Sequence, residues 1–357
     1  MIPVHTGWFV TCSVDIILSE ELTMTLNPVF SDGLVIQANQ PTRVFGEGGG
    51  HVRVEFCGQT IEKDFCGTKW VIELQPLNYG GPYEMKITLD NRLSVLKDVF
   101  VGDVFLIAGQ SNMQFKLSEI NVPEAYAENS NLRLFSTTRV EGGERFTPDD
   151  GWVKATTDTV ADFSAIGYMF GQELQLKTNH AIGLISLYQG AAAIQCFLPS
   201  CVFEQNPHLV IPFERRYDMN YVWNEHPSIL FDFALAKISP FSFGGVVWYQ
   251  GESNCSEEES QIYYDLLHHL ITSWRKELCS DNLPFVVIQI HDFIHRDTIS
   301  WHTIQKAQEE IAEKEKWVKT VITKDVCETD RIHPLRKKEV AHRVVKALTE
   351  FMNSHIQ

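Results

Sequence analysis

Residues 99–113 read Val-Phe-Val-Gly-Asp-Val-Phe-Leu-Ile-Ala-Gly-Gln-Ser-Asn-Met. The run over residues 99–108 is almost continuously apolar, which is typical of a parallel strand buried on both faces. A glycine and several polar residues follow at once, which indicates a tight turn where the strand ends. The segment therefore predicts a buried strand that presents polar side chains at its carboxyl end.

Strands and helices alternate along the rest of the chain. Apolar strand patterns occur at residues 181–187, 244–249, 284–290 and 318–323, and helical patterns occur at 166–176, 261–278, 303–311 and 337–352. This alternation is the pattern of βαβ units, which build a mostly parallel sheet. We therefore predict an α/β domain over residues 98–357.

Residues 24–97 have a different pattern. Short apolar runs and turn clusters alternate about every ten residues, which predicts a small β-sheet or β-sandwich module. The glycine-rich run at residues 46–50 lacks a Gly-Lys-Ser/Thr ending and a following helix, so it predicts a hairpin connection rather than a phosphate loop. Residues 1–23 lack a basic start and a small-residue cleavage site, and we expect them to be an extension outside the fold.

Composition excludes several classes of protein. The chain has 357 residues and a formal net charge of -16, which argues against nucleic acid and anionic membranes as partners. The eight cysteines contain no Cys-x-x-Cys pair and no zinc spacing, so we predict reduced thiols and no metal. Their scatter and the lack of a signal peptide predict the cytoplasm, with a secreted or periplasmic location as the alternative. The oligomeric state stays open.

Residues that directly follow the predicted strands are the candidates for chemistry, because ligands bind beyond the carboxyl ends of an open α/β sheet. Ser111 follows the first strand, where its hydroxyl and the nearby backbone N–H groups suit nucleophilic attack. Gly190 follows the second strand and leaves its N–H accessible. The run Gln250-Gly251-Glu252-Ser253-Asn254 follows the third, where a side-chain amide can donate to an oxyanion.

A candidate base lies near the C-terminus, in the run Asp330-Arg331-Ile332-His333-Pro334. The three-residue spacing lets the Asp330 carboxylate reach the His333 ring, fix its tautomer and stabilise the imidazolium. His291 and Asp292, which follow the strand at 284–290, are the rival pair, although their adjacency makes a mutual hydrogen bond awkward. The sequence thus supplies a nucleophile, a base and candidate oxyanion donors at one sheet edge.

Four segments resemble the sialate O-acetylesterase family of the SGNH hydrolase superfamily. They are residues 102–113, 246–254 and 330–334, together with the opening segment Asn-Pro-Val-Phe-Ser-Asp-Gly-Leu-Val-Ile-Gln at 27–37. The likeness covers nearly all of the chain after Met24. It implies a three-layer α/β/α sandwich with a mostly parallel sheet, preceded by a small N-terminal β domain.

The resemblance also implies a serine esterase that removes O-acetyl groups from a carbohydrate, most of all a sialic acid, through an acetyl-enzyme and with no metal or organic cofactor. Ser111 would be the nucleophile, His333 the base and Asp330 its orienting acid. The oxyanion donors would be Ser111, Gly190 and Gln250, with Glu252, Asn254 and Gln110 in supporting positions. The role of Glu252 is left open.

Two departures from the family concern the sugar. Residues 190–192 read Gly-Ala-Ala where the family usually has Gly-Gly-Thr, and Gln305 replaces an arginine. A sialic acid carboxylate also needs a local cation on this acidic chain, for which the candidates are Arg215, Arg216, Arg296 and, beside His333, Arg331. Acetylxylan or another acetylated glycan is the alternative substrate. A non-catalytic carbohydrate-binding protein and a thioesterase or lipase-type hydrolase are the alternatives from other classes.

Overall fold

The computed structural model describes residues 23–120, 127–137, 139–141, 144–146, 151–212, 214 and 221–354. Apart from Thr23, the predicted N-terminal extension lies outside these residues, and so do Arg215 and Arg216.

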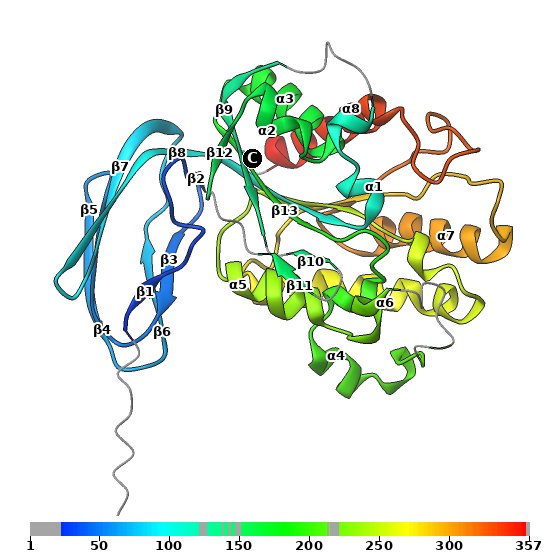
Figure 1. Ribbon diagram of the computed structural model, residues 1–357, viewed down its shortest axis with the longest axis horizontal. Coiled ribbons are helices and arrows are strands. Elements are labelled where there is room, and N and C mark those ends of the chain that lie inside the picture. The colour runs from blue at the N-terminus through cyan, green and yellow to red at the C-terminus, as the bar shows by residue number, and fades with distance from the viewer. Residues whose placement is uncertain are drawn as a thin grey trace, which may run out of the picture.

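One long strand, β8 (Arg92–Gly109), runs through both parts of the molecule (Figure 1). Its first part pairs with β7 (Gly80–Leu89) and with β2 (Val35–Gln37), as far as Gly102. From Asp103 onward it pairs with the strands of the α/β part. The predicted boundary at residue 98 therefore falls inside a continuous strand.

The N-terminal strands form two layers. Strand β4 (Gly50–Phe56) pairs with β5 (Gln59–Phe65) and β7, whereas β1 (Thr25–Leu26), β3 (Thr42–Glu47) and β6 (Lys69–Leu74) form a separate sheet. The hairpin predicted at residues 46–50 is wrong, because β3 and β4 belong to different sheets. Both strands bury apolar side chains such as Val44 and Val52, so the sheets face each other across a core instead of pairing edge to edge.

The α/β part is built on a mixed sheet with the order β12-β9-β13-β8-β14-β15-β16. The strands beside β8 are β12 (Val153–Ala155), β9 (Asn129–Ser136), β13 (Ile182–Tyr188), β14 (Gly245–Tyr249), β15 (Phe285–Ile288) and β16 (Val318–Val321). Neighbours are parallel except β12 and β9. Every residue of β13, β14 and β15 is buried, which explains their continuous apolar runs.

Long helices cover both faces of this sheet (Figure 1). Helix α3 (Ala165–Thr178) packs on α8 (Lys337–Ser354), and α6 (Glu257–Glu277) packs on α7 (Thr298–Lys314). Polar side chains cap three of them: Ser164, Ser256 and Asp297 each accept a backbone N–H of the first turn. None of the described helices is long and apolar enough to cross a membrane.

Shorter elements complete the chain. They are α1 (Ser111–Gln114), η1 (Leu117–Glu119), β10 (Arg139–Glu141), β11 (Glu144–Phe146), α2 (Thr157–Ala161), η3 (Ile194–Phe197), α4 (Ser200–Gln205), η4 (Pro207–Leu209), η6 (Val222–Glu225), η7 (Phe231–Leu235), α5 (Ala236–Ile238) and η8 (Glu252–Asn254).

Candidate active site

The polar segments predicted from the sequence meet at the carboxyl ends of β8, β13 and β14. The sheet register places Gly109, the last residue of β8, beside both Tyr188 and Tyr249. Ser111 begins α1 two residues after β8 ends, and Gly190 and Gln250 follow the two neighbouring strands. The parallel sheet thus brings the three segments to one edge.

The turn after β8 depends on close backbone contact with β14. Gly109 has a φ of +135°, and a Cβ atom there would lie 2.1 Å from the Tyr249 carbonyl oxygen, so only glycine fits. The next residue, Gln110, is buried and accepts the N–H groups of Gly251 (3.3 Å) and Ser253 (3.1 Å) at its Oε1. Gln110 therefore holds the Ser111 turn against the segment after β14.

Ser111 is partly exposed at the first position of α1. The N–H of a first helical residue has no partner within its helix. Among the described residues, none accepts a hydrogen bond from the Ser111 hydroxyl or N–H. Both groups are therefore available to a substrate.

The His333 loop is attached directly to the Ser111 turn. Asn112 Nδ2 donates to the Ile332 carbonyl oxygen at 3.0 Å, which links the neighbour of Ser111 to the neighbour of His333. The His333 ring also lies 5.6 Å from the Phe115 ring, centroid to centroid, at the end of the same short helix. These contacts bring the predicted nucleophile and the predicted base together.

Two more side chains hold the backbone of this loop. His291 Nε2 donates to the Arg331 carbonyl oxygen at 2.7 Å, and Glu328 Oε2 accepts the N–H groups of Leu335 (3.1 Å) and Arg336 (3.3 Å). Burial lowers the pKa of His291 to about 4, so the ring is neutral near pH 7. His291 therefore positions the base loop and does not form the rival pair with Asp292.

Asp330 is exposed, and no hydrogen bond or ion pair joins it to His333 in the part of the chain that the structure describes. Burial lowers the pKa of the His333 ring, the positive charge of Lys337 lowers it further, and Glu119 opposes both. Arg331, two residues before His333 in the same loop, is exposed. The role of Asp330 as the orienting acid stays a prediction.

A buried charged network lies beneath the two reactive residues. Asn112 Oδ1 accepts from Lys337 Nζ at 2.6 Å, and Asn112 Nδ2 donates to Glu252 Oε1 at 2.6 Å. Lys337, Asn112 and Glu252 are 0%, 1% and 4% exposed. The Asn112 amide thus bridges a buried cation and a buried carboxylate.

Gly190 lies next to Ser111, since a Cβ atom built on it would be 3.9 Å from the Ser111 Cβ. Its N–H donates to Gln114 Oε1 at 2.6 Å. The predicted oxyanion donor is therefore in the right place, and a side chain of α1 accepts its hydrogen.

Gln250 is fully buried, and the structure gives its amide a different task from the predicted one. Its Nε2 donates to Asn254 Oδ1 (2.7 Å) and to the Ala192 carbonyl oxygen (3.2 Å). Asn254 Oδ1 also accepts the Ile194 N–H at 3.0 Å. Gln250 and Asn254 therefore support the loop that carries Gly190.

Comparison with known proteins identifies the family of this chain. A family model described as "Carbohydrate esterase, sialic acid-specific acetylesterase" matches residues 101–350. The chain belongs to this family. Membership confirms the resemblance read from the sequence and makes the protein a carboxylic ester hydrolase.

Individual relatives align with most of the chain. Sialate O-acetylesterase from Rattus norvegicus is 27% identical over 84% of this chain and 68% of its own length. The Homo sapiens protein of the same name is 28% identical over 80% of this chain and 62% of its own. A carbohydrate acetylesterase from Xanthomonas citri superimposes with a TM-score of 0.81 and 26% identity, covering 93% of this chain and 76% of that one.

Sequence reasoning missed several residues of the candidate site. Asn112, Gln114, Glu328 and Lys337 make the contacts described above, and Asn224 holds the Gly190 loop by accepting from the Ala193 N–H and donating to the Ala191 carbonyl. Asn112 and Gln114 lie within the Ser111 segment, so their position was a usable signal. No pattern in the sequence indicated a role for Asn224 or Lys337.

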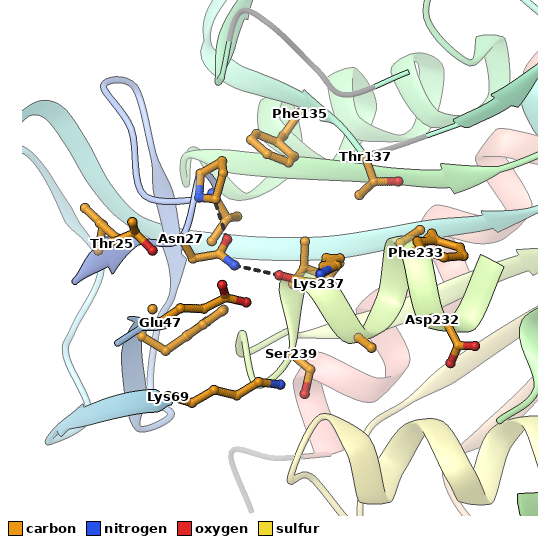
Figure 2. Close-up of a pocket in the computed structure, with 18 residues that line it drawn as sticks. Thr25, Asn27, Glu47, Lys69, Phe135, Thr137, Asp232, Phe233, Lys237 and Ser239 are labelled. Carbon is orange, nitrogen blue, oxygen red and sulfur yellow. Dashed lines mark hydrogen bonds between the residues drawn. The ribbon is translucent and has the colours of Figure 1, made fainter. Parts of the chain in front are cut away.

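A cavity of about 590 Å³ lies elsewhere, between the N-terminal strands and α5 (Figure 2). Its lining includes Thr25, Glu47, Phe135 and Asp232, and Asn27 Nδ2 donates across its wall to the Lys237 carbonyl at 2.6 Å. None of the acetylesterase site residues lines it. The described residues also contain no group of three His, Cys, Asp or Glu side chains that could hold a metal ion.

Proposed function

We propose that the protein hydrolyses O-acetyl esters of carbohydrates at Ser111, with O-acetylated sialic acid as the substrate and an acetyl-enzyme as the intermediate. The observation that carries the proposal is the hydrogen bond from Asn112 to the Ile332 carbonyl, because it joins the Ser111 turn to the His333 loop. The family and the names of the relatives support the acetyl ester and the sugar. The proposal includes the three-layer SGNH arrangement, with residues 24–97 as a separate β module.

In the first half of the reaction, Ser111 Oγ attacks the acetyl carbonyl carbon and His333 accepts the serine proton. The tetrahedral oxyanion accepts the N–H groups of Ser111 and Gly190. The bond to the sugar oxygen then breaks, and His333 returns the proton to that oxygen.

In the second half, water attacks the acetyl-serine carbonyl and His333 accepts a proton from the water. The same two N–H groups hold the second oxyanion. When it collapses, the bond to Ser111 Oγ breaks, His333 returns the proton to Oγ, and acetate leaves. Burial favours the neutral form of His333, which is the form that a general base needs.

The Gln114 side chain has to release the Gly190 N–H before that N–H can donate a hydrogen bond to an ester oxygen. Gln250 is a supporting residue in this scheme, since both of its amide hydrogens are already donated to Ala192 and Asn254.

The test is acetate release from p-nitrophenyl acetate and from an O-acetylated sialic acid. Ser111→Ala should abolish turnover of both, and the matched control Ser118→Ala, at an exposed position just beyond α1, should keep the wild-type rates. His333→Ala should lose activity by a factor similar to that of Ser111→Ala, because nucleophile and base act as a unit. A Ser111→Ala enzyme with wild-type rates refutes the mechanism.

The sugar is tested separately through Arg331, an exposed cation two residues before His333. Arg331→Ala should lower kcat/KM for the sialic acid, which carries a carboxylate, and leave a neutral acetylated xylan unchanged. Equal effects on both substrates would favour acetylxylan or another neutral glycan. The name of the Xanthomonas citri relative, a carbohydrate acetylesterase, keeps that alternative in view.

A further inference from the structure

Lys337 is a buried cation in an unfavourable place. It is 0% exposed, and it is the first residue of α8, where the positive end of the helix dipole disfavours a cation. No carboxylate among the described residues forms an ion pair with it. Its ammonium group instead donates to Asn112 and lies 5.2 Å and 5.5 Å from the ring centroids of Phe115 and Tyr249.

We propose that Lys337 is a positioning residue of the esterase reaction: it orients the Asn112 amide that holds the His333 loop beside the Ser111 turn. This inference rests on the proposed function and adds a residue to it. Two lines of observation bear on it: the geometry of the amide carries it, and the charges around the site support it.

The first line is the orientation of the Asn112 amide. Its Oδ1 faces the Lys337 ammonium, and its Nδ2 donates to Glu252 and to the Ile332 carbonyl. Turning the amide over would break all three contacts, because an NH₂ group cannot accept from an ammonium and a carbonyl cannot donate. The cation therefore fixes the donor that positions the loop of the base.

The second line is the charge around the site. The groups that face Lys337 are Glu119 on η1, Glu252 on η8, Cys327 and Glu328 in the loop before α8, and the rings of Tyr249, His291 and His333. The Lys337 charge opposes protonation of both His333 and His291. A neutral residue at this position would leave Glu119 to favour the His333 imidazolium.

The pH dependence of the rate follows from these charges. Burial lowers the pKa of Lys337 to about 8, so the ammonium is present near pH 7 and is lost above about pH 8. In the wild type, kcat/KM should fall on the acid side as His333 is protonated and on the alkaline side as Lys337 is deprotonated. Without the Lys337 charge, the acid limb should move to higher pH and the alkaline limb near pH 8 should disappear.

The experiment is a profile of kcat and kcat/KM for p-nitrophenyl acetate from about pH 5 to about pH 10, corrected for spontaneous hydrolysis. Lys337→Met should lower kcat by about a hundredfold through misplacement of the base. Its acid limb should rise by roughly half a pH unit. Lys338→Met, the exposed neighbour on the same helix, should match the wild type in both kcat and profile.

The double variant Lys337→Met/Glu252→Gln keeps the buried network electrically balanced and guards against failure of the single variant to fold. It should show the same loss of the alkaline limb. Profiles of Lys337→Met or of the double variant that match Lys338→Met in kcat and in the acid limb would overturn the inference. If Ser111→Ala is inactive in the same assay, such a result refutes the role of Lys337 alone; if Ser111→Ala stays active, the proposed function itself fails.

Discussion

The side chain of Gln114 competes with the substrate for an oxyanion donor, and removing it should make the enzyme faster. Gln114 Oε1 accepts the Gly190 N–H at 2.6 Å, a few ångströms from Ser111. An ester carbonyl oxygen needs the same hydrogen when it becomes an oxyanion. The Gly190 N–H is therefore already hydrogen-bonded before a substrate arrives.

The size of the effect follows from the net worth of one hydrogen bond. Exchanging a neutral intramolecular bond for one to water changes the free energy by about 1 kcal/mol, which corresponds to about a fivefold change in rate. Gln114→Ala removes the competing acceptor and should raise kcat/KM for p-nitrophenyl acetate by about fivefold. Gln114→Glu replaces it with a carboxylate, a stronger acceptor that also repels the oxyanion, and should lower kcat/KM by about tenfold.

Initial rates at pH 7 for the wild type, both Gln114 variants and Ser118→Ala decide the matter, with circular dichroism to verify folding. The reasoning is refuted if Gln114→Ala loses activity, because Gln114 would then contribute to the reaction rather than compete with it.

Three further outcomes are expected. Asp330→Asn tests the predicted orienting acid: without a hydrogen bond between Asp330 and His333, as in the described residues, kcat/KM should change by no more than about threefold, whereas a loss of about 10⁴-fold would establish the orienting role. Ala191 has a φ of +55°, so Ala191→Gly should raise the free energy of unfolding by about 1 kcal/mol in urea titrations, and an unchanged midpoint would contradict strain there. Burial lowers the pKa of His291 in the folded protein to about 4, below the ordinary histidine value of 6.5, so the folded protein binds fewer protons than the unfolded chain between these two pH values. The free energy of unfolding of the wild type should therefore fall by about 3 kcal/mol through this group as the pH falls from 6.5 towards 4. Urea titrations at these pH values should show a smaller loss for His291→Gln.

Strand prediction succeeded where burial alone determines the sequence. The apolar runs at 99–108, 181–187 and 244–249 correspond to β8, β13 and β14, whose residues there are all or nearly all buried. Strand β5, in contrast, reads Gln-Thr-Ile-Glu-Lys-Asp-Phe and has no buried residue. It forms because β4 offers a pairing edge, and that information does not lie within the segment itself.

The site shows the same division. Ser111, Gly190 and Gln250 were found because the carboxyl ends of parallel strands share one edge, which is a rule about topology. The partners of these residues depend on side-chain directions after folding, so the engagement of Gly190 by Gln114 was not predictable. Lys337 is 225 residues from its partner Asn112 and sits in an Arg-Lys-Lys run that is typical of an exposed helix start.

The contacts of the site explain why so few of its polar groups are reactive. Gln110, Asn112, His291 and Glu328 all direct their side chains to backbone N–H or carbonyl groups of the loops around Ser111 and His333. Each such hydrogen bond restrains the backbone of a loop. It also occupies a side chain that could otherwise bind the substrate. Ser111 and His333 are left without such a task, so the same hydrogen bonds that make the loops rigid also determine which two residues can exchange a proton.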